Sequence, residues 1–142
     1  MEIGIINGPN LNWLGRRQPD VYGTESMEEL LRDLRQAYPA HHFLYQQHNA
    51  EGALVEALQQ LGQRCAGILL NPAAYTHTSL AIADAVAMLP CPVLEVHLSN
   101  TAGRAPIRRH SYVSAVASGS ISGLGLSGYR LAVQHLLASG QK

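Results

Sequence analysis

Short strand-like segments alternate with helical segments along the whole chain. Runs that are apolar throughout, or apolar at every second position, predict five strands at residues 2–7, 42–47, 67–70, 92–96 and 120–124. Apolar side chains at helical spacing predict four helices at residues 26–38, 51–63, 79–89 and 129–138, the third capped by Thr78 or Ser79. Strands that alternate with helices usually form a parallel sheet covered on both faces, so the sequence predicts an α/β fold.

The length of 142 residues is that of one ordinary domain, and we expect residues 1–142 to form a single domain. The preferred arrangement is a flavodoxin-like three-layer sandwich with right-handed crossovers and strand order 2-1-3-4-5. In such a sheet, ligands bind beyond the carboxyl ends of the strands, near the switch point between strands 1 and 3.

Polar clusters follow three of the predicted strands, at residues 7–10, 71–79 and 97–100. Asn10, Asn71 and His77 each have an ordinary explanation, because asparagine favours turns and a histidine can satisfy loop backbone. Parallel strands, however, bring all three clusters to one edge of the sheet. Together they predict a pocket for a small acid that carries several hydroxyl groups.

The sixteen-residue segment 8–23 is too long for a strand-to-helix turn of about 2–6 residues. Arg16 and Arg17 precede Tyr22, and guanidinium charge favours a phenolate, so Tyr22 could act as a base. The alternative is a solvated surface loop, and the segment alone does not decide between the two.

Charge and composition exclude several classes of protein. The formal net charge is zero, which argues against nucleic acid and against a membrane surface, and no apolar run reaches the ~18–20 residues that span a bilayer. The only lysine is Lys142, so Schiff-base chemistry, a P-loop lysine and a pyridoxal phosphate attachment site are improbable. Five of the nine arginines fall in predicted loops or turns, which favours a small anionic ligand (Arg16, Arg17, Arg104, Arg108 and Arg109).

Cys65 and Cys91 are interpreted as small apolar residues without a disulfide or a redox role. The chain starts with a strand-like run and no basic leader, so we expect a cytoplasmic protein.

Three other patterns were weighed as functional motifs. Residues 123–128 match G-x-G-x-x-G, but only 14 residues follow, without a strand or an acidic residue, so a tight turn is favoured over a dinucleotide site. His77, His97 and His110 lack the short paired spacing of zinc ligands. Glu95 lies two positions before His97 on one strand face and could orient it as an acid, although His97 could also be a hydrogen-bonded histidine at a strand end.

Four segments resemble type II 3-dehydroquinate dehydratases. The family's opening I-N-G-P-N-L-N-x-L-G-x-R matches residues 6–17, with the family's tyrosine at Tyr22, and residues 47–52, 71–79 and 95–100 match later motifs in order. The resemblance implies a lyase that dehydrates 3-dehydroquinate to 3-dehydroshikimate through an enolate, without a cofactor or metal. That reaction serves the shikimate pathway, and hence chorismate and aromatic amino acid biosynthesis, or quinate metabolism.

The same resemblance implies roles for individual residues. Tyr22, as a phenolate favoured by Arg17, would be the base, and His97, oriented by Glu95, would be the acid. Asn10 would hold the water that stabilises the enolate oxygen. The ring hydroxyls and the carboxylate would be bound by Asn71, His77, Leu98, Ser99 and Arg108. Arg104 and Gln18 would belong to the segments that close over the site.

The family also implies an assembly, a homododecamer built as a tetramer of trimers. In it, Asp84 would reach a neighbour's site across the trimer contact.

The sequence departs from the family pattern near the expected lid. Gln18 stands where the family usually has glutamate, and the segment around Arg104 lacks the family's acids and one histidine. Trp13 replaces a small or aliphatic residue, and Ala83 an arginine that is common before the aspartate. The alternative function is therefore a weakened relative that binds a quinate-like acid as a sensor or scaffold.

Overall fold

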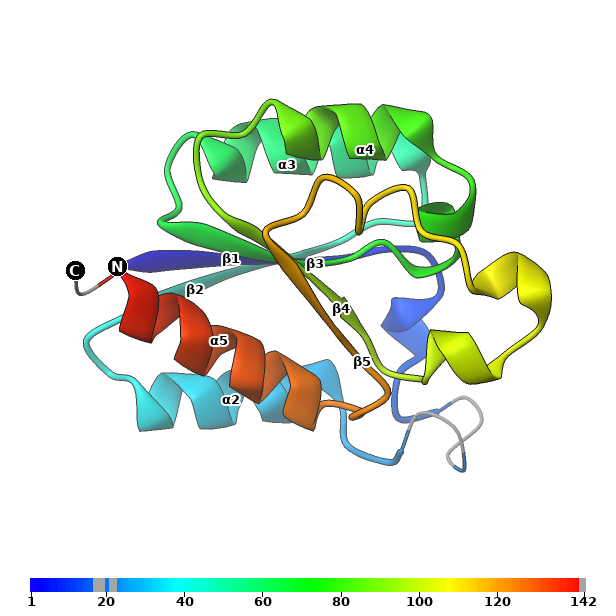
Figure 1. Ribbon diagram of the computed structural model, residues 1–142. Coiled ribbons are helices and arrows are strands. Elements are labelled where there is room, and N and C mark those ends of the chain that lie inside the picture. The colour runs from blue at the N-terminus through cyan, green and yellow to red at the C-terminus, as the bar shows by residue number, and fades with distance from the viewer. Residues whose placement is uncertain (17–19, 21–22, 141–142) are drawn as a thin grey trace.

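The structure is a computed structural model, and it describes residues 1–16, 20 and 23–140 of the chain. In this part of the chain, five parallel strands form one sheet of order β2-β1-β3-β4-β5 (Figure 1). The strands are β1 (Glu2–Asn7), β2 (His42–Gln47), β3 (Gly67–Asn71), β4 (Val93–His97) and β5 (Gly119–Ser122). The predicted strand order is confirmed.

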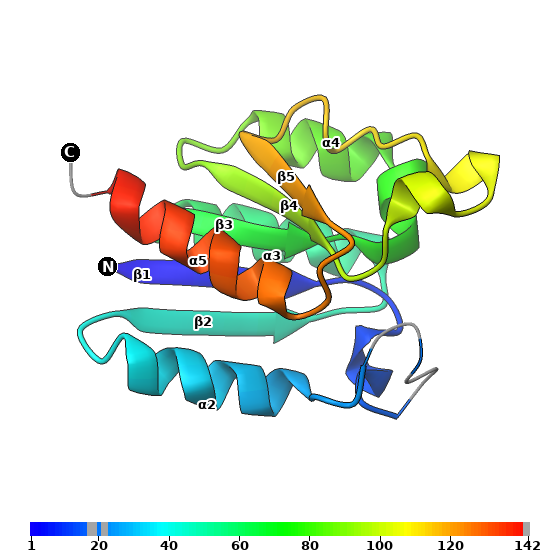
Figure 2. The same cartoon turned by 60° about the horizontal axis from the view of Figure 1, so that its bottom comes forward.

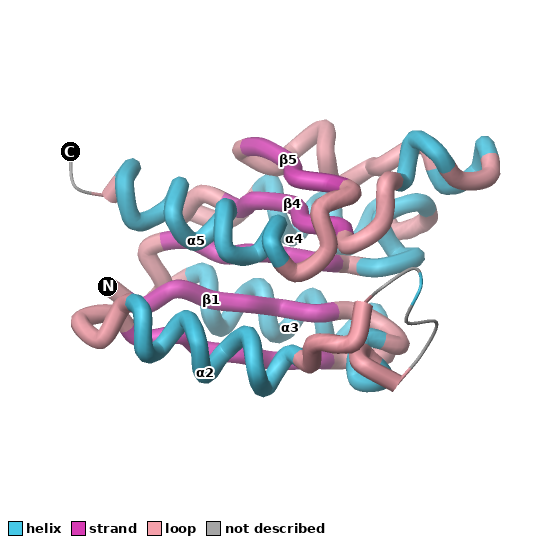
Figure 3. The backbone as a smooth tube through the Cα atoms, turned by 90° about the horizontal axis from the view of Figure 1, so that it is seen from below, coloured by secondary structure: helices cyan, strands magenta, loops and turns pink. Residues whose placement is uncertain are grey.

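Two helices cover each face of the sheet, as Figures 1 and 2 show. The helices α2 (Met27–Ala37) and α5 (Ser127–Ser139) lie on one face, and α3 (Glu51–Gly62) and α4 (Leu80–Ala87) lie on the other. Figure 3 looks onto one face of the sheet, with the strands running across the picture and α2 and α5 in front of them. The predicted three-layer sandwich is confirmed.

The core has two halves because the strands are buried on both faces. Ile3, Ile5 and Leu69 pack under α2 and α5, whereas Ile68 and Leu70 pack under α3 and α4. Successive side chains of a strand point to opposite faces, so a strand between two helical layers needs an unbroken apolar run. This explains the unbroken runs without a polar side chain at residues 3–6 of β1 and 67–70 of β3.

Helix starts follow the capping signals of the sequence. The Ser26 hydroxyl accepts a hydrogen bond from the Glu29 amide (3.2 Å), and the Glu29 carboxylate accepts one from the Ser26 amide (2.8 Å). This capping box, predicted from the sequence, opens α2. For α4, the N-cap is Ser79, whose hydroxyl accepts from the Ile82 amide at 2.9 Å.

Several predicted boundaries were wrong by one or two residues. The fourth strand begins at Val93 because Pro92 has no amide hydrogen to donate to the sheet. The fifth strand ends at Ser122 because Gly123 turns the chain at φ +87°, where an added Cβ would lie 3.1 Å from Asn100 Cβ. With Gly125 also at positive φ, the G-x-G-x-x-G segment forms the predicted tight turn.

Cys65 and Cys91 are free thiols, as expected. Among the residues described, no helix has both the length and the apolar character needed to cross a bilayer.

Candidate active site

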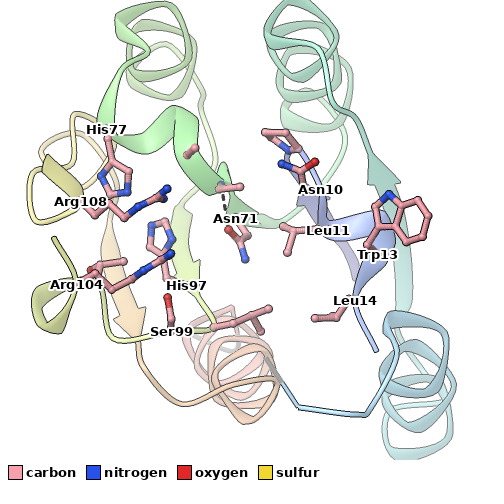
Figure 4. A pocket seen from close by; sticks show the side chains of 15 residues that line it. Asn10, Leu11, Trp13, Leu14, Asn71, His77, His97, Ser99, Arg104 and Arg108 are labelled. Atoms are coloured by element: carbon pink, nitrogen blue, oxygen red, sulfur yellow. Dashed lines mark hydrogen bonds between the residues drawn. The ribbon is translucent and has the colours of Figure 1, made fainter. Parts of the chain in front are cut away.

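A cavity of about 120 Å³ lies beyond the carboxyl ends of β1, β3 and β4. Side chains from all three strand ends point into it (Figure 4). The convergence predicted from the polar clusters is therefore confirmed. The lining residues are Pro9, Asn10, Leu11, Trp13, Leu14, Asn71, Ala73, Ala74, His77, His97, Leu98, Ser99, Thr101, Arg104 and Arg108.

Close contacts between loops position Asn10. An added Cβ on Gly8 would lie 2.6 Å from the Pro72 carbonyl oxygen, so only glycine allows this approach. Asn10 adopts a left-handed backbone conformation (φ +71°), and its amide donates to Asn49 Oδ1 at 3.0 Å. Gln47 Nε2 donates to both Asn49 Oδ1 (3.0 Å) and the Gly8 carbonyl (3.1 Å). The motif at residues 47–52 therefore supports the loop that carries Asn10.

A series of hydrogen bonds, each donated to the next residue, links Ala73, Asn71, Tyr129 and Asn7 and holds the Asn71 side chain in place. The Ala73 amide donates to Asn71 Oδ1 (3.1 Å), and Asn71 Nδ2 donates to the Tyr129 hydroxyl (2.9 Å). The Tyr129 hydroxyl in turn donates to Asn7 Oδ1 at 2.7 Å. The backbone amide of Ala73 can only donate a hydrogen bond, so it must contact the oxygen and not the nitrogen of the Asn71 side chain. This contact fixes the orientation of the side-chain amide.

Tyr129→Phe is expected to lower the free energy of unfolding by about 2 kcal/mol, because it leaves Asn7 Oδ1 and Asn71 Nδ2 without their buried partner. Denaturant unfolding of both proteins measures this difference. Tyr38→Phe is a matched control, since Tyr38 is only partly buried, at the end of α2. If Tyr129→Phe and Tyr38→Phe lose the same free energy of unfolding, the buried hydrogen bonds of Tyr129 make no specific contribution to stability.

Glu95 and His97 form a buried pair at the end of β4. His97 Nε2 lies 2.6 Å from Glu95 Oε1, and the Glu95 side chain is 0% exposed. A carboxylate only accepts hydrogen bonds, so Nε2 carries the hydrogen of this contact and Nδ1 is left free of it. Burial alone would raise the pKa of Glu95, but hydrogen bonds from His97, Ser114 and Thr76 outweigh it and hold the pKa at about 2. Glu95 is therefore ionised at neutral pH.

This pKa predicts a loss of stability in acid. The Glu95 pKa lies below its ordinary value of 4.5, so its contribution is fully present above about pH 4.5 and is lost as pH falls toward 2. The contribution is about 3 kcal/mol. The free energies of unfolding of the native chain and of Glu95→Gln should therefore differ most at neutral pH and converge in acid. A difference that stays constant from pH 7 to pH 3 would contradict the assignment.

His77 lies beside His97 in the cavity. The two rings are stacked with centroids 6.5 Å apart and an angle of 18° between their planes (Figure 4). His77 Nδ1 lies 2.7 Å from the His110 carbonyl oxygen, so Nδ1 carries a hydrogen and Nε2 is free to contact a ligand. His110 contributes its backbone here. Among the described residues, no three histidine, cysteine or acidic side chains gather as metal ligands would.

Arg104 and Arg108 supply positive charge on the same side of the cavity as the histidines (Figure 4). They come from the segment that holds η3 (Thr101–Gly103) and η4 (Pro106–Arg108). Two guanidinium groups beside two imidazoles suit an anionic ligand, and a planar fork suits a carboxylate. Arg16 and Arg109, by contrast, are exposed, and neither lines the cavity.

The structure brings most of the predicted site residues together. Asn10, Asn71, His77, His97, Leu98, Ser99, Arg104 and Arg108 line the cavity, and Glu95 lies behind His97. Asp84 is exposed on α4 and does not line this cavity. Arg17, Gln18 and Tyr22 lie outside the described residues.

Sequence reasoning missed the groups that support Glu95 and Asn71. Thr76 lay inside a matched motif but had no assigned role, and Ser111, Ser114 and Tyr129 had none either. An acid at a strand position buried on both faces is the one signal in the sequence that could have prompted a search for donors.

Comparisons with known proteins identify a family, similar sequences and a similar structure for this chain. A family model described as dehydroquinase class II matches residues 1–137. The chain is 49% identical over 138 residues to a 3-dehydroquinate dehydratase of Pseudomonas syringae pv. tomato, covering 95% of this chain and 92% of the relative. It is 46% identical over 135 residues to 3-dehydroquinate dehydratase 2 of Agrobacterium fabrum, with 94% and 92% covered. A type II dehydroquinase structure from Propionibacterium acnes has a TM-score of 0.89 at 40% identity, over 95% of this chain and 94% of that one.

Proposed function

This chain belongs to the class II dehydroquinase family, and on that premise we propose that it is a hydro-lyase that converts 3-dehydroquinate to 3-dehydroshikimate. The observation that carries the proposal is the His97–Glu95 pair, which opens into a cavity lined by two arginines and by polar groups from three strand ends. The reaction belongs to the shikimate pathway, and the same step would also serve quinate degradation.

The first step is removal of a proton from the carbon next to the ketone. Tyr22 is the proposed base, acting as a phenolate that Arg17 favours. The electrons of the broken C–H bond move onto the ketone oxygen and form an enolate. Asn10, at the cavity wall, would hold the water molecule that stabilises this oxygen.

The second step is loss of the hydroxyl group. The enolate electrons form the new C=C bond as the C–O bond breaks, and His97 gives its proton to the departing oxygen, so water leaves. Ionised Glu95 supports this role because the hydrogen bond that it accepts from Nε2 fixes the orientation of the imidazole and leaves Nδ1 to face the substrate. The product is a conjugated enone.

Binding is assigned to the remaining groups of the cavity. Arg108 would pair with the substrate carboxylate, while Asn71, His77, Ser99 and the Leu98 backbone would bind ring hydroxyls. Arg104 would close over the bound substrate together with the segment that contains Gln18. His77 Nδ1 is held by the His110 carbonyl, which leaves Nε2 for the ligand, and Asn71 Nδ2 has a second hydrogen besides the one that it donates to Tyr129.

The proposed assembly is a dodecamer of four trimers, with Asp84 reaching a neighbour's site. Leu80, Asp84 and Met88 are spaced four residues apart on or just beyond α4, so they lie on one side of it. Leu80 is 61% exposed and Met88 is 72% exposed. Large apolar side chains on both sides of an exposed acid support a contact with a second copy.

Incubation of the purified protein with 3-dehydroquinate tests the function, with the ultraviolet absorbance of the enone as the readout. We expect catalytic turnover without any added cofactor. Gln18 and the altered segment around Arg104 favour one other outcome, a sensor or scaffold that binds the acid. Binding by calorimetry with no enone formed would support that function and overturn the lyase.

A further inference from the structure

Three hydroxyl groups surround the Glu95 carboxylate, and none of the three residues lines the cavity. We propose that Thr76, Ser111 and Ser114 are positioning residues, which hold Glu95 ionised and aligned so that His97 keeps the orientation of a proton donor. The inference rests on the proposed function, because it names the groups on which the proposed acid depends.

Both oxygens of the Glu95 carboxylate accept hydrogen bonds. Glu95 Oε1 is in contact with His97 Nε2 (2.6 Å), Ser111 Oγ (2.9 Å) and Thr76 Oγ1, and Oε2 is in contact with Ser114 Oγ. An ionised carboxylate has about four lone-pair sites and no hydrogen to give. Each of these four neighbours has a hydrogen to donate, which matches the ionised form of Glu95.

The hydrogens of the cluster can be assigned. The Ser114 amide donates to Ser111 Oγ at 2.9 Å, and Ser111 Oγ lies 2.6 Å from Thr76 Oγ1. Thr76 and Ser114 each donate their one hydroxyl hydrogen to Glu95. Ser111 donates either to Glu95 or to Thr76, which then passes its own hydrogen to Glu95. In both arrangements, the hydroxyl hydrogens of Thr76 and Ser114 point to the carboxylate, and that of Ser111 points to the carboxylate or to Thr76.

The donors are needed because the pair is buried. Burial favours the neutral acid, and a neutral Glu95 could no longer stabilise a charge on His97. The ionisable groups beside the pair within the described residues are His77, stacked on His97, and Arg104 and Arg108 on the same side of the cavity (Figure 4). None of these three is a hydrogen-bond partner of Glu95 in the structure, so the hydroxyls together with His97 are the groups that offset its burial.

One backbone segment positions both halves of the site. The Tyr112 amide donates to the Thr76 carbonyl (2.9 Å), which ties the segment of Ser111 and Ser114 to η2 (Ala73–His77). The His110 carbonyl in the same segment accepts from His77. Residues 110–114 therefore orient the acid through Glu95 and a proposed binding residue through the backbone.

Thr76 offers a matched pair of variants. Thr76→Val keeps the shape and removes the hydroxyl, whereas Thr76→Ser keeps the hydroxyl. We expect Thr76→Val to lower kcat about tenfold or more with little change in KM, because orientation of the acid acts on the chemical step. Thr76→Ser should restore kcat. Ser114→Ala should behave like Thr76→Val, and because Ser114 is exposed it should fold even if Thr76→Val does not.

The exposed Ser118 provides the control, and Ser118→Ala should keep the native kcat. A kcat for Thr76→Val and Ser114→Ala within about twofold of the control, or equal losses in Thr76→Ser and Thr76→Val, would overturn the proposal.

Unfolding experiments test the hydrogen bond between Ser114 and Glu95 without an activity assay. The free energies of unfolding of the native chain and Ser114→Ala should differ more at pH 7 than at pH 3, because the lost hydrogen bond favours the ionised carboxylate. If the native protein shows no turnover, the proposed lyase function is wrong. The unfolding comparison would still show whether the hydroxyls hold Glu95 ionised. An equal difference at both pH values would overturn the inference.

Discussion

The Tyr22→Phe variant is expected to bind 3-dehydroquinate and to lose turnover, with kcat lower by about a thousandfold or more. The variant lacks only the hydroxyl that takes the proton from carbon. An ordinary tyrosine is only ~0.1% ionised at neutral pH, and lowering a pKa by about two units requires ~2.7 kcal/mol. One close guanidinium, that of Arg17, could supply that energy. Steady-state kinetics and calorimetric binding would separate the two effects.

Two buried or partly buried tyrosines of the described chain, Tyr129 and Tyr45, are poor replacements for this base. Tyr129 is fully buried, and burial raises its pKa well above the ordinary tyrosine value. Burial also raises the pKa of Tyr45. Neither can supply a phenolate at neutral pH. Tyr38→Phe, on α2, is the control and should keep native turnover. Native turnover in Tyr22→Phe would rule out the proposed base.

The His97→Asn variant is expected to lose about 10²–10⁴-fold in kcat with binding retained, because the departing hydroxyl receives no proton. Asparagine keeps a polar group in place of the ring but has no proton to release at neutral pH. The measurement is enone formation at saturating substrate. His135→Asn, an exposed histidine on α5, serves as the control. Equal rates for the two variants would mean that another group protonates the oxygen.

The kcat of Glu95→Gln is expected to lie between that of the native chain and that of His97→Asn. Glutamine keeps a hydrogen bond to His97, but it removes the negative charge beside the ring. A loss as large as that of His97→Asn would show that charge, and not orientation, dominates the role of Glu95.

The fold was predictable because local patterns and global topology agree. Unbroken apolar runs at β1 and β3 require helices on both faces, and the Ser26 capping box fixed the start of α2. The positions of Asn10, Asn71, His77 and His97 then followed from one rule, that parallel strands end at one edge. Predicted boundaries were wrong where a contact between residues distant in sequence sets the end of an element, as at Gly123 beside Asn100.

The supporting groups of the site could not be predicted in the same way. Ser111 and Ser114 come from an irregular segment without periodicity, and only the folded chain brings them to Glu95. Tyr129 is 122 positions from Asn7, and in the sequence it is one more large residue on a buried helix face. Hydrogen bonds between distant segments leave no local pattern, whereas hydrophobic periodicity does.

Deuterium uptake from heavy water tests the division of labour between Tyr22 and His97 most directly. Substrate would be incubated with each variant, recovered, and analysed for deuterium at the carbon next to the ketone, while enone formation is followed in parallel. If Tyr22 removes the proton and His97 acts only on the hydroxyl, His97→Asn should exchange deuterium into 3-dehydroquinate with little product, and Tyr22→Phe should do neither. Exchange or product from Tyr22→Phe at the native rate would contradict the proposed mechanism.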